Sequence, residues 1–257
     1  MVSDRLQRIR HKKERAEKHI LDLQLALKVF RDSSPYEVVR DSQTHMGEFV
    51  YRVAKVEPTP PNVMLIAGDA IQNLRSTLDH LIWQLVKANG QPTNRHLGYP
   101  IFPDHESYVA GVNGKIQGVV AGVANVIDGT NPYKGGNDQF WLLDKLNNID
   151  KHRVLIGTGW FFENVQVGSS APWGEAVASG YVATAKHFTV QPVNRSRPLK
   201  AGDVLHTTGV DLGEKVKFGL EVAFDEPQVV RGEAVLETIK GFASLVDQTI
   251  NQLTPFL

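Results

Sequence analysis

The residues with the clearest capacity for chemistry lie on one predicted helix, in the stretch from Asn62 to Gly90. Arg75 and His80 stand five positions apart there, with Asp79 directly before the histidine. A histidine with a pKa of about 6.5 can accept or give a proton at neutral pH, and an arginine can hold a phosphate through two parallel hydrogen bonds. With a ribose 2′-hydroxyl as internal nucleophile, such a pair supplies what metal-independent RNA cleavage needs.

The spacing of this pair sets a geometric condition on that chemistry. Five residues of an α-helix correspond to about 140° of rotation, so the two side chains do not point in one direction. They converge if Arg75 reaches round from the flank of the helix, or if two copies of the helix meet across a two-fold axis. In the second arrangement each subunit contributes an arginine and a histidine to a composite site. The partner expected in that arrangement is a second copy of the chain, in a homodimer.

The rest of this helix combines a wide apolar face with an unusual polar face. Its apolar residues recur at steps of three and four, at Ala67, Ala70, Ile71, Leu74, Leu78, Leu81, Ile82 and Leu85. The polar face carries no Lys or Glu, the usual residues of a solvated face, but instead Asp69, Asn73, Ser76 and His80. We expect a shared polar pocket in which Arg75 and His80 are supported by Asp69, Asn73, Ser76 and Asp79.

A second dense polar cluster lies at residues 147–153, where a predicted helix gives way to a strand. If that helix packs beside the central one, Asp150 and His152 approach Asp69 and His80 and complete the pocket. Two carboxylates and two imidazoles also form a reasonable ligand set for a divalent metal, but no close-spaced motif such as H-E-x-x-H supports it. The prediction is therefore no metal and no cofactor. In the alternative interpretation these residues only lock the junction between helix and sheet.

A long bundle helix with an R-x4-6-H string resembles the HEPN superfamily, whose catalytic members are ribonucleases, often toxins or antiviral effectors. The resemblance implies that RNA is the partner, that Arg75 holds its phosphate and that His80 is the acid/base. Three features depart from the family: Ser76 follows the arginine where Asn, Asp or His is frequent, the string is not on the last helix, and the β region is atypical. The segments GDAIQNLRSTLDHLIWQL and WLLDKLNNIDKHR also resemble a widespread group of uncharacterised bacterial proteins, and this implies no activity.

A structural interpretation of the same helix competes with the catalytic one. Arg75 and Asp79 are four residues apart and can simply pair, which leaves His80 as a partly buried histidine bonded to Asn73 or Ser76. The protein is then a non-catalytic helical bundle that binds a protein partner or a small ligand. Arg75 close to His80 in an open, positive cleft favours the ribonuclease, whereas burial of Arg75 against Asp79 favours the binding protein.

Composition narrows the function classes. Among 257 residues, Lys plus Arg equals Asp plus Glu at 28 each, so no global charge argues for nucleic acid or a membrane. The absence of cysteine excludes thiolate metal sites and a cysteine nucleophile. A polar N-terminus and the lack of an apolar run of about 20 residues predict a cytoplasmic protein without membrane contact. Residues 5–18 are locally basic, which indicates either a phosphate-binding helix or a solvated face.

Apolar periodicity predicts an α+β fold in which a bundle of about four main helices carries an antiparallel β-sheet region before the last helix. The helices are expected at 3–32, 62–89, 138–150 and 232–253, with two short ones between 104 and 126. A hairpin is expected from 36–40 and 48–56. After Arg153 the apolar period changes to two, and strands are expected at 154–162, 173–189, 203–210 and 215–224. The predicted domains are a bundle (1–152 with 230–257) and a β insertion (153–229).

Overall fold

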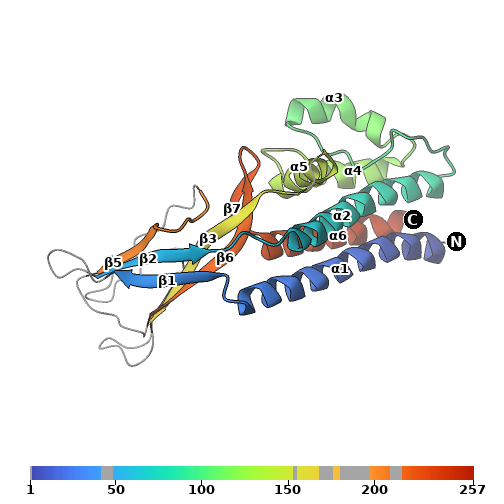
Figure 1. Cartoon of the computed structure of the whole chain (residues 1–257). Helices are drawn as coiled ribbons and strands as arrows, with labels where there is room; N and C mark the ends of the chain where they lie inside the picture. The colour runs from blue at the N-terminus through green and yellow to red at the C-terminus, as the bar shows by residue number, and fades with distance from the viewer. Residues whose placement is uncertain (1, 42–48, 153–154, 168–175, 180–196, 209–215) are drawn as a thin grey trace. The chain divides into compact units, whose positions relative to one another are not determined.

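The computed structural model describes residues 2–41, 49–152, 155–167, 176–179, 197–208 and 216–257. It shows a mixed α+β chain, which confirms the α+β part of the prediction (Figure 1). The chain divides into two compact units. The first unit comprises Met1–Ala26, Pro61–Ile156 and Leu236–Leu257, and the second comprises Leu27–Pro60 and Gly157–Val235.

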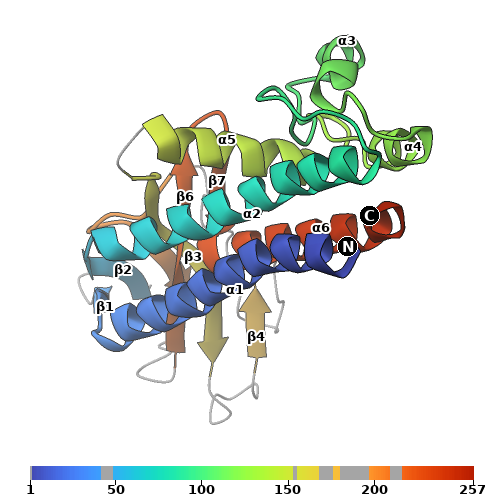
Figure 2. The same cartoon turned by 90° about the vertical axis from the view of Figure 1, so that its right-hand side faces the viewer.

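The first unit is built from helices. Three long helices lie side by side in it (Figures 1 and 2): α1 (Val2–Asp32) as far as Ala26, α2 (Pro61–Ala88) and α6 (Val235–Leu253). Helix α5 (Asp138–His152) packs against α2. Two short helices, α3 (His105–Lys115) and α4 (Ala121–Gly129), occupy the connection between α2 and α5. None of the described helices combines the length and apolar character needed to cross a membrane.

The core of the first unit follows from the helical repeat of the sequence. All eight apolar residues predicted to face inward from α2 are buried. Opposite them, α6 buries a stripe of its own, comprising Ile239, Phe242, Val246, Ile250 and Leu253. Each large apolar side chain that leaves water contributes about 1.5–3 kcal/mol, so these stripes decide which side of each helix faces its neighbours.

The second unit consists of two antiparallel sheets. The first has the strand order β1-β2-β5, formed by β1 (Tyr36–Asp41), β2 (Phe49–Val56) and β5 (Val204–Thr208). The second has the order β4-β3-β6-β7, formed by β4 (Ala176–Ser179), β3 (Thr158–Val167), β6 (Val216–Glu226) and β7 (Val230–Ala234). Trp160 of β3 stacks on Phe30 and Tyr36 with ring centroids 5.3 Å apart in each pair.

The division of the chain differs from the predicted domains. The β1–β2 hairpin was expected within the bundle domain, but β2 pairs with β5, about 150 residues further on, and so belongs to the second unit. The alternation of apolar residues predicts that a segment is a strand, but it does not name the remote strand that pairs with it. Most of the strand expected at 173–189 lies outside the described residues, which include only 176–179 of it.

Candidate functional site

Arg75 lies on the side of α2 that faces α5, and two carboxylates surround its guanidinium. Its Nε donates to Asp144 Oδ1 at 2.9 Å, its Nη1 donates to Asp79 Oδ1, and its Nη2 donates to the Tyr99 carbonyl oxygen at 3.3 Å. The side chain is only 13% exposed. Burial lowers the pKa of Arg75, but Asp79 and Asp144 together raise it above its ordinary value. The permanent cation thus ties α2 to α5 and to the loop that follows α2.

The acceptors of Arg75 are themselves held in place. Asp79 Oδ1 accepts a second hydrogen bond from the backbone N–H of Tyr99 at 2.9 Å, and Asp144 Oδ2 accepts one from Asn148 Nδ2 at 3.0 Å. A Cβ at Gly98 would lie 2.7 Å from Asp79 Oδ1, so the glycine allows the loop backbone to come close to α2. The Arg75 cluster therefore has the completeness expected of a structural ion-pair network.

His80 lies on a different side of α2, the side that faces α1. The ring is half-buried, and its Nε2 lies 3.2 Å from Gln84 Nε2, one helical turn further on. Burial lowers the pKa of His80, and the charges of Lys12, Arg8 and Lys87 lower it further. Among the described residues, the charges that act on this imidazole are all positive. His80 is therefore a neutral base at pH 7 in a cationic environment.

The cations around His80 come mainly from α1. Lys12 Nζ donates to Ser76 Oγ at 2.9 Å, and Arg5 Nη2 donates to the Lys87 carbonyl oxygen at 3.4 Å. These two contacts show that α1 and α2 run antiparallel, because the higher residue number on one helix meets the lower number on the other. The basic start of α1 thus lies along the second half of α2. We define the basic face as Arg5, Arg8, Lys12, His80 and Lys87.

Asp69 and Asp150 approach each other near the start of α2. A Cβ at Gly68 would lie 2.1 Å from Asp150 Oδ1, so the carboxylate of α5 rests on a point of α2 that has no side chain. Burial raises the pKa of Asp150, the charge of Asp69 raises it further, and Lys151 opposes both. The predicted approach of the two polar clusters therefore occurs, but only for this pair of carboxylates.

The shared polar pocket predicted around His80 is not formed. Asp150 meets α2 at Gly68, and His80 is 12 residues (80 − 68) further along, which corresponds to about 18 Å of helix. His152 is exposed at the last turn of α5, and Asn73 uses its amide to donate to the Asp69 carbonyl oxygen at 2.8 Å.

The four possible metal ligands do not gather at one place, since only Asp69 and Asp150 approach each other. The described residues contain no group of three or more His, Asp or Glu side chains that could hold a metal ion, so Asp69, His80, Asp150 and His152 make no such site. Nor do Arg75 and His80 contact each other within one chain: Arg75 is bonded to Asp144 of α5 and to the Tyr99 carbonyl oxygen in the loop that follows α2, whereas His80 faces α1. The structure thus distributes the predicted pocket over three places on α2.

The sequence contained no sign of the partner of Arg75 on α5, but it did contain a sign of the cations near His80. Asp144 is the main partner of Arg75 on α5, but 69 positions separate the two residues and no spacing rule links them. The cations near His80 did leave a signal, since Arg8 and Lys12 belong to the basic stretch at residues 5–18. Only the packing of α1 on α2 shows that this stretch and His80 belong together.

The chain was compared with known proteins at three levels. It matches no family model, no curated protein and no solved structure. The resemblance to the HEPN superfamily therefore stands on the R-x4-H string and its helical setting alone, and the function must be argued from the residues of the first unit.

Proposed function

We propose that this protein binds RNA through the basic face of its helical unit. The observation that carries the proposal is that no carboxylate among the described residues pairs with the cations of that face. In the described part of the chain, Arg8, Lys12 and Lys87 form no ion pair, whereas Lys13 on the same helix pairs with both Glu17 and Asp247. Like charges held together without a carboxylate repel one another, so the face is best satisfied by an anionic ligand.

The chemistry of the face fits single-stranded RNA. A row of cations at successive helical turns can follow a phosphate backbone, and each neutralised phosphate releases counterions. Trp83 lies beside this row, with Lys87 Nζ 5.8 Å from the centre of its ring. An indole face can stack an unpaired base, which single-stranded RNA offers and a duplex does not.

Arg75 has a supporting role in this proposal. Its guanidinium is occupied by Asp79, Asp144 and the Tyr99 carbonyl oxygen, so a phosphate would have to displace two carboxylates to reach it. This arrangement favours the non-catalytic interpretation of Arg75, in which the residue stabilises the bundle that presents the basic face.

Fluorescence anisotropy with a labelled single-stranded oligouridine tests the proposal. The double variant Arg8→Ala/Lys12→Ala should bind at least about tenfold more weakly at low salt, and should lower the slope of log affinity against log salt by about 1.4. The matched control Lys28→Ala/Lys240→Ala removes two cations that pair with Asp32 and Glu237, and should keep both affinity and slope. Absence of binding by the wild type, or equal losses in both variants, would overturn the proposal.

A second candidate function, metal-independent RNA cleavage, is favoured by the lowered pKa of His80. A neutral imidazole can take the proton of a ribose 2′-hydroxyl, while Lys12 and Arg8 stabilise the phosphate charge that develops. Cleavage of the same RNA in EDTA should fall by about 100- to 10,000-fold in His80→Ala. His96→Ala, which removes an exposed loop histidine, should leave the rate unchanged. A wild type that binds RNA without cleaving it would reject catalysis and keep the binding function.

A further inference from the structure

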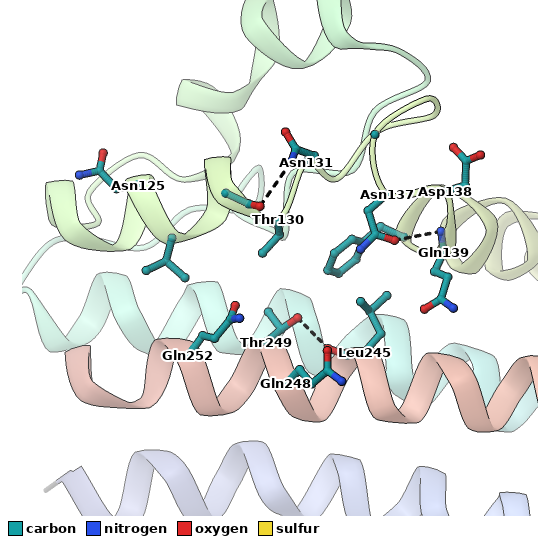
Figure 3. A pocket seen from close by; sticks show the side chains of 14 residues that line it. Asn125, Thr130, Asn131, Asn137, Asp138, Gln139, Leu245, Gln248, Thr249 and Gln252 are labelled. Carbon is teal, nitrogen blue, oxygen red and sulfur yellow. Dashed lines mark hydrogen bonds between the residues drawn. The ribbon is translucent and has the colours of Figure 1, made fainter.

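The first unit contains a pocket of about 910 Å³ that the RNA proposal does not use. It lies between α4, the loop that leads into α5, the start of α5, and α6 (Figure 3). The described residues that line it include no Lys, Arg or His, and their one charged side chain is that of Asp138, whose Oδ1 accepts a hydrogen bond from the Gly135 backbone N–H at 2.6 Å. Its lining is instead rich in side-chain amides, from Asn125, Asn131, Asn137, Gln139, Gln248 and Gln252.

Most of these amides have unused hydrogen-bonding capacity. In the part of the chain that the structure describes, no hydrogen bond involves the side chains of Asn125, Gln139, Gln248 and Gln252. Each primary amide carries two N–H donors and one carbonyl acceptor. Figure 3 shows Gln139 reaching from α5 toward α6 and Gln252 extending from α6 toward α4. Amides from both sides thus face one space and can exchange water for a ligand.

The layer beneath the pocket is fixed by buried contacts. The Tyr99 hydroxyl and Thr130 Oγ1 are 2.8 Å apart, and Thr130 Oγ1 donates to the Ile127 carbonyl oxygen at 2.7 Å. The Tyr99 ring, which is fully buried, stacks on Phe140 with centroids 5.1 Å apart. Because these groups are already packed and bonded, the floor of the pocket is formed before a ligand arrives, and binding has to order only the side-chain amides above it.

The lining excludes several ligand classes. The described lining offers a phosphate or a carboxylate no Lys, Arg or His side chain with which to pair, and the carboxylate of Asp138 would repel it. Its one aromatic residue, Phe140, is fully buried, so no exposed ring is present to stack a nucleobase or the apolar face of a sugar. The lining amides favour a ligand with in-plane donors and acceptors, and a peptide unit has one N–H and one carbonyl group that a side-chain amide can pair in the same plane.

We propose that this pocket binds the main chain of an extended polypeptide segment. Gln248 and Gln252 are four residues apart on α6, which places their amides about 6 Å apart along the helix axis. An extended chain presents its backbone groups on one side every second residue, at about 6.4–6.8 Å. Two glutamines of α6 can therefore pair with successive outward-facing peptide units, and Gln139 can pair from the opposite wall.

An uncharged, soluble probe tests this proposal on the whole chain. The probe is a hexapeptide of alternating Thr and Ala, acetylated and amidated at its ends. Titration of ¹⁵N-labelled protein should give saturable shifts of the side-chain amide signals of the pocket. Gln248→Ala/Gln252→Ala should weaken binding by about tenfold, since each lost hydrogen bond costs about two- to tenfold. The same peptide with N-methylated backbone nitrogens should bind the wild-type protein no more tightly than the unmethylated peptide binds this variant.

Matched controls make the outcome decisive. Gln7→Ala/Gln72→Ala removes two exposed glutamines of α1 and α2 that do not line the pocket, and should keep full affinity. Alanine is well tolerated on exposed helix positions, so both double variants should melt at the wild-type temperature. No saturable shift up to about 10 mM peptide, equal losses in both variants, or tighter binding of maltohexaose or adenosine would overturn the proposal. The result does not depend on whether the basic face binds RNA.

Discussion

Arg75 and His80 are five residues apart on α2, and they lie in opposite electrostatic environments. The side of α2 that faces α5 surrounds Arg75 with Asp79, Asp144 and a backbone carbonyl. The side that faces α1 surrounds His80 with cations and with neutral side chains such as Gln84. One helix thus carries a cluster in which every charge has a partner and a cluster in which the charges have one sign.

This contrast separates stability from binding. A buried charge is tolerated only when it is paired, so the Arg75 cluster is what folding requires of a polar helix contact. The cations on the other side donate to neutral groups, such as Ser76 and the Lys87 carbonyl oxygen, and their like charges repel one another. This repulsion is the reason for our proposal that they serve a ligand. Arg75, the residue with the more complete set of contacts, is therefore the less promising functional group.

The largest expected effect is the loss of stability in Arg75→Ala. Removal of one partner of a buried ion pair costs about 3–5 kcal/mol. We expect a loss of stability of about 3 kcal/mol, at the lower end of this range, because the Asp79 side chain is 43% exposed and water can solvate its carboxylate once the arginine is removed. This corresponds to a melting temperature lower by about 6–12 °C. Lys28→Ala, which breaks the exposed pair with Asp32, should cost less than about 0.5 kcal/mol. Equal losses of stability in the two variants would contradict a structural role for Arg75.

A smaller effect is expected for the stability of His80→Ala. The imidazole makes one hydrogen-bonding contact, to Gln84, so its removal should cost about 1 kcal/mol or less. Urea unfolding followed by circular dichroism compares this variant directly with Arg75→Ala. A cost as large as that of Arg75→Ala would mean that both sides of α2 are structural, and the contrast between them would fail.

The pH dependence of stability should change slightly when His80 is replaced. The folded pKa of His80 lies below its ordinary value of 6.5, so the unfolded chain binds the proton more readily. Stability from this group is therefore complete above about pH 6.5 and is lost as the pH falls toward the folded pKa. His80→Gln should flatten the stability profile between about pH 7 and 5. A profile identical to that of the wild type, or an NMR titration of His80 above 6.5, would contradict the cationic environment.

The smallest effect is expected at Asp150, whose carboxylate meets that of Asp69. The pKa of Asp150 is raised by burial and by Asp69, so its ionised form is disfavoured in the folded protein. Asp150→Asn should therefore raise stability at pH 7 by a few tenths of a kcal/mol. The gain should vanish as the pH falls through the folded pKa, because the wild-type carboxyl is then protonated. A loss of more than about 0.5 kcal/mol would show that the carboxylate makes a contact of its own.

Local patterns predicted the elements better than their partners. The three- and four-residue apolar steps identified the buried face of α2, since the face of a helix depends only on its own repeat. The pair of Arg75 with Asp79 was likewise predictable at i, i+4. The pairing of β2 with β5 and the bond of Arg75 to Asp144 were not, because each joins residues far apart in the chain.

The sequence by itself determined the α+β class, the long helices and the stock of titratable side chains on α2. It also placed Arg75 and His80 about 140° apart, on different sides of one helix. Only the tertiary structure decided which charges each side meets, because the neighbours of α2 come from α1 and α5. Packing brought Asp144 to Arg75, Arg8 and Lys12 to His80, and Asp150 to Gly68. The chemistry of a string such as R-x4-H is therefore set by the helices packed against it.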